Sequence, residues 1–226
     1  MNSFPFAIVG FDLDGTLLDT HKDLARAVNH ALSLESRPAI PAAEVRDLIG
    51  GGARTMLVRA LEVTGGAVPA ARFDELHAAL LAFYEDNICI DTDLFPGGYA
   101  MLDALEARGV KLAVVTNKLE RFARAIFDGL GLTDRFYTVI GGDTLGPGRS
   151  KPRPDLLNLM LERGGNAGRA AYVGDTTYDT GAAAAAGLPC IAVSFGFCDR
   201  PAHELGAAAV IDHFDELVPT LERLGD

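Results

Sequence analysis

The stretch Phe11-Asp12-Leu13-Asp14-Gly15-Thr16 follows directly on the apolar run from Phe6 to Phe11. The run predicts a buried strand, and Gly15 permits a sharp turn where it ends. Two carboxylates two residues apart repel each other, so one stable state keeps Asp12 charged, ready to act as a nucleophile, and leaves a proton on Asp14. An Asp-x-Asp turn is also typical of capping, so the rest of the chain must decide between the two readings.

Further apolar runs end, like the first, at polar or glycine-bearing turns, and helical patterns lie between several of them. Alternating strands and helices predict an α/β fold with a doubly wound, parallel, Rossmann-like sheet. Ligands of such sheets bind beyond the carboxyl ends of the strands. The predicted strands after the first are Lys111 to Thr116, Phe136 to Ile140, Ala170 to Gly174, Pro189 to Ser194 and Ala207 to Ile211, and the helices are Leu119 to Leu130, Asp155 to Arg163, Tyr178 to Ala186 and Phe214 to Leu224.

The alternation stops between the first strand and Lys111, where apolar residues recur at helical spacing without a convincing strand. We therefore predict an inserted all-helical unit at residues 20–91, here called the cap, on a core of residues 1–19 and 92–226. Hinges are expected near Thr20 and Gly97, and the cap is either a lid over the strand ends or a decorative insertion. Its predicted helices are Ala25 to Leu34, Ala42 to Leu48, Ala53 to Val63 and Ala70 to Tyr84.

A second pair of carboxylates, Asp175 and Asp179, follows the predicted strand that ends at Gly174. The two acids lie four residues apart where a helix begins, so they could share one metal ion. Oxygen ligands without cysteine or paired histidine favour Mg²⁺ over zinc. Capping of the helix by Asp175 is the alternative, and both roles could hold at once.

Two further strand ends carry groups suited to phosphate. Thr116 and Asn117 close one strand, and Lys151 lies in a Ser-Lys-Pro segment before the next helix. A hydroxyl, backbone N–H groups and an ammonium are suitable partners for phosphate oxygens. The neighbouring Lys118 and Lys111 are predicted to be surface charges.

The composition of the chain excludes some classes of binding partner. The 226 residues suit one compact core with a modest insertion, and the net charge of -11 with a pI near 4.8 argues against nucleic acid and anionic membranes. Cys89, Cys190 and Cys198 lack the spacing of a zinc site or a disulfide framework. No basic segment opens the chain, so we expect a cytoplasmic protein. The uncharged run from Asp179 to Asp199 is broken by Gly187-Leu188-Pro189, which favours a helix and a short strand over a membrane span.

Taken in order, Asp-x-Asp-Gly-Thr, the strand-end Thr116, the Lys-Pro segment and Gly-Asp-x-x-x-Asp resemble the haloacid dehalogenase-like hydrolase superfamily from end to end. The helical insertion after the first motif is similar to the small cap of its first subclass. The segments most similar to phosphoglycolate phosphatases are Phe11 to Thr20, Ile49 to Ala53, Leu94 to Gly97, Val114 to Lys118 and Val139 to Asp143. One departure is Arg153, where those relatives often carry histidine.

This resemblance implies a Mg²⁺-dependent phosphatase that acts on a small phosphorylated metabolite, with 2-phosphoglycolate as the expected substrate. Asp12 would attack phosphorus, and Asp14 would protonate the leaving oxygen and then activate water.

The resemblance also implies a ligand set. Asp175 would join Asp12 and the Asp14 carbonyl around Mg²⁺, and Asp179 would support the metal through water or through Lys151. Thr116 and Lys151 would hold the phosphoryl oxygens.

Substrate choice is expected to lie in the cap. Gly51 and Gly52 could bring backbone N–H groups close to a ligand together with Asn117 of the core, and Arg54 could pair with a substrate carboxylate. The alternative is a flexible turn with Arg54 in solvent. His21 and Lys22 either line the entrance or form a solvated first helical turn.

Other activities fit less well. A dehalogenase does not keep an acid in the role of Asp14, and phosphonate hydrolysis needs a cap lysine, whereas no lysine occurs between Lys22 and Lys111. A sugar-phosphate mutase, which shares both aspartates, and a non-enzymatic phosphate-binding module stay open. The oligomeric state is not predicted.

Overall fold

A computed structural model describes residues 4–225 and contains a six-stranded sheet in which every neighbouring pair is parallel. The strands lie in the order β5-β4-β1-β6-β7-β8, so β1 occupies the centre and the chain winds outward from it in both directions. The predicted α/β fold with a doubly wound parallel sheet is confirmed. The strands are β1 (Ile8–Phe11), β4 (Lys111–Val115), β5 (Thr138–Ile140), β6 (Ala170–Gly174), β7 (Cys190–Val193) and β8 (Ala209–Ile211).

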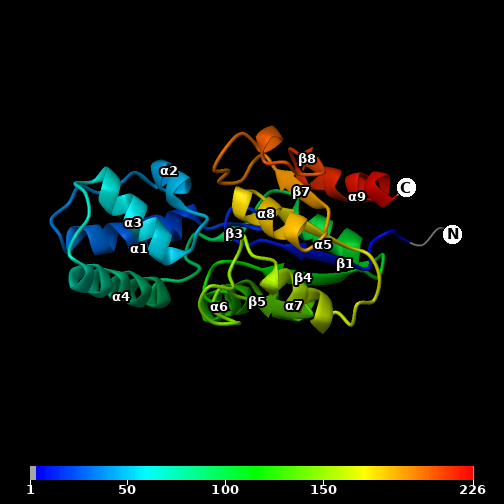
Figure 1. Cartoon of the computed structure of the whole chain (residues 1–226), viewed down its shortest axis with the longest axis horizontal. Coiled ribbons are helices and arrows are strands. Elements are labelled where there is room, and N and C mark those ends of the chain that lie inside the picture. The colour runs from blue at the N-terminus through cyan, green and yellow to red at the C-terminus, as the bar shows by residue number, and fades with distance from the viewer. Residues whose placement is uncertain (1–3, 226) are drawn as a thin grey trace.

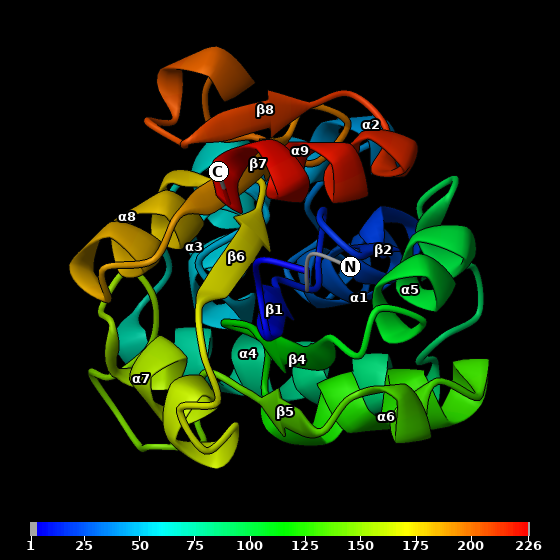
Figure 2. The same cartoon turned by 90° about the vertical axis from the view of Figure 1, so that its right-hand side faces the viewer.

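Alternate side chains of the strands point to opposite faces of the sheet and form two apolar clusters. Val9 and Phe11 belong to one cluster, and Ile8 belongs to the other. Helices cover both faces, which explains why the strands read as continuous apolar runs (Figure 2). One face carries α7 (Asp155–Arg163) and α8 (Thr177–Ala185), and the other carries α5 (Gly98–Glu106), α6 (Glu120–Leu130) and α9 (Leu217–Gly225).

The helices of the cap gather at one end of the molecule (Figure 1). Their apolar stripes, which include Leu24, Leu57 and Leu80, face one another and are buried. The predicted helices are present, although the exact division between cap and core stays a prediction. The helices are α1 (His21–Ser33), α2 (Ala42–Val45), a 3₁₀ turn at Arg46–Leu48, α3 (Ala53–Val63) and α4 (Ala70–Asp86).

Two short strands, β2 (Leu18–Asp19) and β3 (Asp93–Leu94), form an antiparallel ribbon where the sequence predicted none. The ribbon lies where the chain passes between core and cap. The buried Asp23 carboxylate reinforces this passage by accepting hydrogen bonds from the backbone N–H groups of residues 90, 91 and 92, at 3.0 to 3.2 Å. The two connections to the cap are therefore tied to each other.

The remaining differences are local. Helix α5 was not predicted, and the last predicted helix divides into a 3₁₀ turn and α9. Within residues 4–225, no helix is both long and apolar enough to cross a membrane. Further 3₁₀ turns lie at Thr133–Arg135, Ala202–Glu204 and Phe214–Glu216.

Candidate active site

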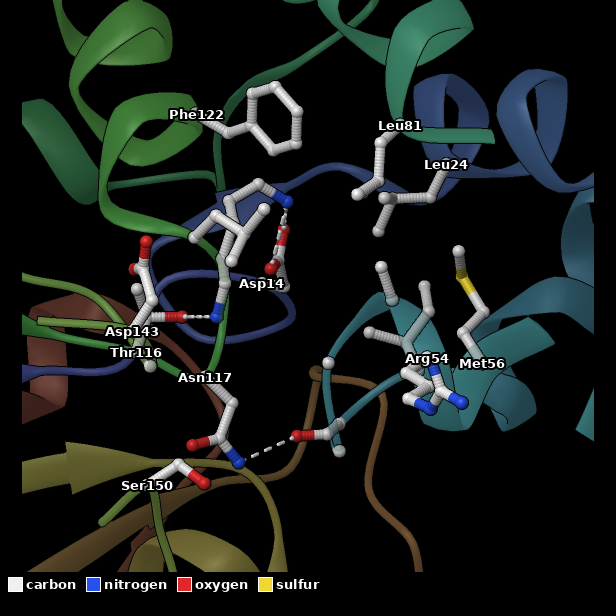
Figure 3. A pocket seen from close by; sticks show the side chains of 18 of the residues that line it. Asp14, Leu24, Arg54, Met56, Leu81, Thr116, Asn117, Phe122, Asp143 and Ser150 are labelled. Atoms are coloured by element: carbon white, nitrogen blue, oxygen red, sulfur yellow. Dashed lines mark hydrogen bonds and ion pairs between the residues drawn. The ribbon is translucent and has the colours of Figure 1, made fainter. Parts of the chain in front are cut away.

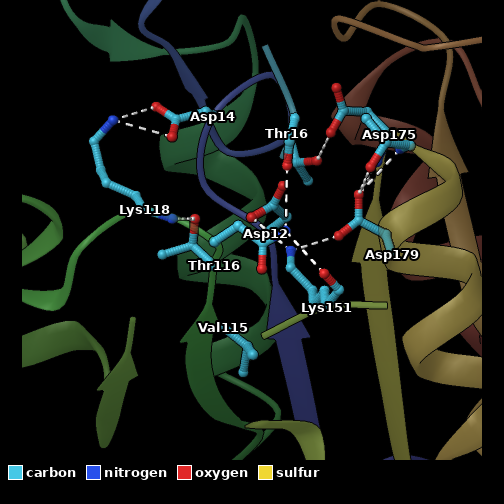
Figure 4. A network of polar contacts seen from close by, with 12 residues as sticks. Asp12, Asp14, Thr16, Val115, Thr116, Lys118, Lys151, Asp175 and Asp179 are labelled. Atoms are coloured by element: carbon cyan, nitrogen blue, oxygen red, sulfur yellow. Dashed lines mark hydrogen bonds and ion pairs between the residues drawn. The ribbon is translucent and has the colours of Figure 1, made fainter. Parts of the chain in front are cut away.

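The carboxyl ends of three adjacent strands bring the predicted site residues together (Figure 4). Asp12 follows β1, Thr116 follows β4 and Asp175 follows β6, and Lys151 approaches from the connection between β5 and α7. All four are buried, although each carries a polar or charged side chain. Burial of several charges in one place requires that they be paired with one another or with a ligand.

Asp12, Asp175 and Asp179 form an acid cluster, since each offers one carboxylate oxygen and these oxygens lie within 4.8 Å of one another. Lys151 is the cation in contact with this cluster among the described residues, at 2.8 Å from Asp12 Oδ1 and 2.6 Å from Asp179 Oδ1. Three ionised carboxylates and one ammonium leave two negative charges, which a divalent cation would balance.

The hydrogen-bond partners also fit a metal ion. The ammonium of Lys151 donates to Asp179 and, at 3.0 Å, to the Tyr172 hydroxyl, but its contact with Asp12 Oδ1 lies outside hydrogen-bond geometry. Asp12 Oδ1 is buried, and its one contact with a cation among the described residues, Lys151 Nζ at 2.8 Å, is poorly directed for a hydrogen bond. A buried carboxylate oxygen whose lone pairs are not fully used is suited to ligate a cation, so the residues present can hold one.

Asp179 lies in the first turn of α8 and is held there by Thr176. Its Oδ2 accepts hydrogen bonds from the Thr176 backbone N–H at 3.0 Å and from the Thr176 hydroxyl at 2.7 Å, and Thr176 is the residue that caps α8. The alternative in which Asp175 caps this helix therefore does not hold, because Thr176 is the N-cap residue and α8 begins at Thr177, one residue before the predicted start. Asp175 instead accepts hydrogen bonds from the Thr16 hydroxyl and the Phe197 backbone N–H, both at 2.8 Å.

Burial dominates the electrostatics of the cluster. It raises the pKa of Asp12 to about 7, with Lys151 opposing the shift and Asp179 adding to it. Burial and the charges of Asp179 and Asp12 also raise the pKa of Asp175 well above its ordinary value. Without a cation, the cluster is therefore expected to retain a proton that exposed carboxylates would lose.

This pKa shift predicts that the metal-free protein becomes less stable as the pH rises from about 4 to about 7. In that range, folded Asp12 keeps a proton that the unfolded chain, with an aspartate pKa near 3.9, has released, so the free energy of unfolding falls as pH increases. The free energy of unfolding is measured by urea unfolding in EDTA, for the wild type and for Asp12→Asn. The difference, wild type minus variant, should fall by up to about 1.4 kcal/mol per pH unit. Saturating Mg²⁺ should flatten this slope. A difference that rises with pH would contradict the assignment.

Asp14 lies outside the acid cluster and has a cation of its own. Its carboxylate accepts hydrogen bonds from the Thr20 hydroxyl at 2.7 Å and from Lys118 Nζ at 2.8 and 3.0 Å. Lys118 is only 7% exposed and lies 4.8 Å from the centre of the Tyr84 ring in α4, so the prediction of a surface charge there is wrong. Burial would lower the pKa of Lys118, but Asp14 and Tyr84 together raise it above its ordinary value. Lys111, by contrast, is exposed as predicted.

Sequence reasoning missed Lys118 because its partners come from distant segments. The one signal was its position three residues beyond the end of β4, at the same sheet edge as Thr116. The Thr116 hydroxyl accepts a hydrogen bond from the Lys118 backbone N–H at 3.1 Å, which fixes the turn. A strand-end lysine facing a strand-end carboxylate is the pattern that could have indicated a buried pair.

A cavity of about 390 Å³ lies between the strand ends and the cap (Figure 3). Its polar lining from the core includes Asp12, Asp14, Thr116, Asn117 and Lys118. Its other walls are mostly apolar. They include Leu24, Ile49, Met56, Leu81, Tyr84 and Phe122.

The cap residues predicted to bind substrate lie at this cavity with different roles. Gly51 and Gly52 line it, while Asn117 donates hydrogen bonds to the carbonyls of Gly50 at 3.3 Å and Lys151 at 3.2 Å and so links cap to core. Arg54 also lines the cavity, but its side chain is 63% exposed.

The guanidinium of Arg54 pairs with Asp74 at 3.1 Å and lies over the Phe73 ring, so it is held at the surface of the cap. His21 and Lys22 do not line the cavity. His21 contacts Asp19, and Lys22 is exposed.

Known proteins share this architecture. The haloacid dehalogenase-like hydrolase family matches residues 9–193. A phosphoglycolate phosphatase of Mesorhizobium japonicum is 39% identical over 218 residues, covering 96% of each chain, and one of Rhodospirillum rubrum is 39% identical over 218 residues, covering 94% of this chain and 89% of the relative. The crystal structure of a predicted phosphoglycolate phosphatase from Haemophilus somnus 129PT has a TM-score of 0.88 at 28% identity and covers 97% of this chain and 99% of its own.

The family match spans the strand ends after β1, β4 and β6, where the acids, the threonine and the lysine converge. The relatives align over nearly their whole length, so the likeness includes the cap as well as the core. The chain therefore belongs to the haloacid dehalogenase-like hydrolase family, as one of its phosphatases.

Proposed function

We propose that this chain is a Mg²⁺-dependent phosphatase that hydrolyses a small phosphate monoester, with 2-phosphoglycolate as the first candidate, through a phosphorylated Asp12. One observation carries the proposal. Asp12 both lines the cavity and belongs to the acid cluster, whereas Asp175 and Asp179 belong to the cluster without lining the cavity. A nucleophile that also ligates the metal must occupy this position. The names of the relatives support the choice of substrate.

In the first half of the reaction, a carboxylate oxygen of Asp12 forms a bond to phosphorus, and the bond from phosphorus to the ester oxygen breaks. Asp14, protonated for this step, gives its proton to the departing alkoxide and is left as the carboxylate that Lys118 contacts in this structure. In the second half, Asp14 takes a proton from water, and the water oxygen attacks phosphorus, which releases inorganic phosphate and restores Asp12. Covalent catalysis divides one difficult displacement into two, and acid–base help contributes about 10²–10⁴-fold.

The remaining residues supply charge and orientation. The Thr116 hydroxyl lines the cavity and can donate to a phosphoryl oxygen, while the Lys151 ammonium beside Asp12 balances the added negative charge. Mg²⁺, held by Asp12, Asp175 and the Asp14 carbonyl with Asp179 in support, would neutralise charge on the phosphoryl oxygens. Gly51 and Gly52 can offer backbone N–H groups from the cap.

Metal dependence gives a test that does not rely on one substrate. EDTA should abolish phosphatase activity and Mg²⁺ should restore it. Mg²⁺ should also raise the melting temperature of the wild type, because a ligand that binds only the folded state stabilises it, by about 2.7 kcal/mol at 100 times Kd. Asp175→Asn should lose most of the activity and of this shift. Full activity in EDTA, or an unchanged Mg²⁺ shift in Asp175→Asn, would contradict the proposed site.

The mutase alternative is less well supported by the cavity. Although Arg54, Asp143 and Ser150 line it, most of its lining surface is apolar, which suits a small substrate better than a sugar with many hydroxyls. Supplying a sugar monophosphate with the matching bisphosphate and measuring isomerisation separates the two activities, and we expect phosphate release without isomerisation.

A further inference from the structure

Two cationic side chains, Arg54 and Lys118, line the cavity, and they differ in place and burial. Arg54 belongs to α3 of the cap, and its exposed guanidinium is held by Asp74. Lys118 belongs to the core, its side chain is only 5% exposed, and its ammonium is directed at the Asp14 carboxylate (Figure 4). A charge pair excluded from water is far stronger than the same pair at the surface. Of the two cations, Lys118 is the one able to recognise an anion strongly.

The position of Lys118 relative to the reacting atoms follows from its shared partner. For proton transfer, the ester oxygen of a bound substrate must lie about 2.6–3.2 Å from Asp14. Lys118 Nζ lies 2.8 Å from Oδ1 and 3.0 Å from Oδ2 of that same carboxylate. The ammonium therefore stands within about 6 Å of the ester oxygen, because both contact one carboxylate at hydrogen-bond distance.

This distance matches one kind of leaving group. In a phosphate ester of a 2-hydroxy acid, a single carbon separates the ester oxygen from the carboxylate, and bond lengths near 1.5 Å place the carboxylate oxygens about 3 Å from the ester oxygen. Such a carboxylate reaches Lys118 while the ester oxygen stays at Asp14. Each added methylene lengthens the leaving group by about one bond, so a longer acid must bend to keep both contacts at once.

We propose that Lys118 is the specificity-determining residue for the leaving group and selects phosphate monoesters of short 2-hydroxy acids by pairing with their carboxylate. The proposal rests on the proposed phosphatase function and assigns to Lys118 the recognition first expected of Arg54. On binding, the ammonium exchanges one oxygen of Asp14 for the substrate carboxylate. The Tyr84 ring, 4.8 Å away, holds the ammonium in place from the cap side.

The expected discrimination is moderate for a physical reason. A site left with an unpaired buried charge rejects the wrong ligand by about 10⁴–10⁵-fold. Lys118 keeps Asp14 as a partner when a neutral leaving group binds, so its charge is never unpaired. We therefore expect a preference of about 10²-fold for the acidic leaving group over a neutral one of equal length.

The test compares kcat/KM for 2-phosphoglycolate and for 2-hydroxyethyl phosphate, which replaces the carboxylate by a hydroxymethyl group. The wild type should prefer the former by about 100-fold, and Lys118→Met should reduce this preference to within about threefold. Both substrates need Asp14, so a general loss of activity caused by disturbing that acid cancels in the ratio of the two kcat/KM values. Arg54→Met should keep the preference, and Lys111→Met, at an exposed lysine, serves as the matched control.

Equal losses on both substrates in Lys118→Met would overturn the proposal, and so would loss of the preference in Arg54→Met. A wild type that hydrolyses both esters equally well would overturn it while leaving the phosphatase function standing. A wild type that hydrolyses neither would overturn both. Should Lys118→Met fail to fold, the phosphate ester of 3-hydroxypropionate, with one further methylene, must be at least about tenfold poorer than 2-phosphoglycolate for the wild type, and equal rates would overturn the proposal.

Discussion

Asp12→Asn is expected to lower kcat by at least about 10⁴-fold, because an amide oxygen does not form the covalent intermediate that divides the reaction into two steps. The substitution keeps the shape of the side chain and removes one of three clustered negative charges. The fold should therefore survive, and the metal-free variant should be at least as stable as the wild type at pH 7.5. Single-turnover and steady-state assays with 2-phosphoglycolate measure the loss, and circular dichroism checks the fold.

A matched control separates nucleophile loss from a general loss of charge. Asp134→Asn removes an exposed carboxylate far along the chain and should leave kcat unchanged. Mass spectrometry of the Asp12→Asn preparation must exclude deamidation, which would regenerate the wild-type side chain. With that excluded, residual activity above about 1% of the wild type is more than a missing nucleophile allows, and Asp12 would lose its role.

The sheet could be predicted because its strands are buried on both faces. Such strands read as continuous apolar runs, and β1 and β6 are examples whose ends the sequence marks with Asp12 and Asp175. The ribbon of β2 and β3 could not be predicted, since two residues per strand carry no periodic pattern and the pairing depends on contacts across the cap. Helix α5 could not be predicted because Pro96-Gly97-Gly98 is typical of a turn. In the structure Gly97, at a φ of 82°, is the N-cap residue of this helix.

The site also contains residues that the sequence could place and one that it could not. Side chains directly after a strand inherit their position from the sheet, so Asp12, Thr116 and Asp175 could be placed together from topology alone. Lys118 could not, because its burial depends on Tyr84 of α4, a helix of the cap. The sequence thus predicts which charged residues lie at the strand ends. It does not predict which residues from other elements contact them, because those contacts form only when the cap packs on the core.

Lys151→Met is expected to destabilise the metal-free protein by about 3–5 kcal/mol at pH 7.5 and to reduce activity by at least about 10²-fold. The substitution retains the volume of the side chain but leaves Asp12 and Asp179 buried without the ammonium that contacts both. Removing one partner of a buried ion pair costs more than the pair itself contributes, because the remaining charge has lost its solvation.

The loss of stability in Lys151→Met should depend on pH and on Mg²⁺, which gives a sharper test. At about pH 5, below the raised pKa of Asp12, that carboxylate holds a proton and needs no counter-ion, so the loss of stability in Lys151→Met should be smaller than at pH 7.5. Mg²⁺ should also reduce the loss at pH 7.5, because it supplies positive charge to the same oxygens. Urea unfolding of the wild type, Lys151→Met and the exposed control Lys111→Met, at both pH values with EDTA or Mg²⁺, measures all three effects. A loss below about 1 kcal/mol in EDTA at pH 7.5, or one that grows as the pH falls, is what a solvated lysine would give, and it would remove Lys151 from the charge balance of the acid cluster.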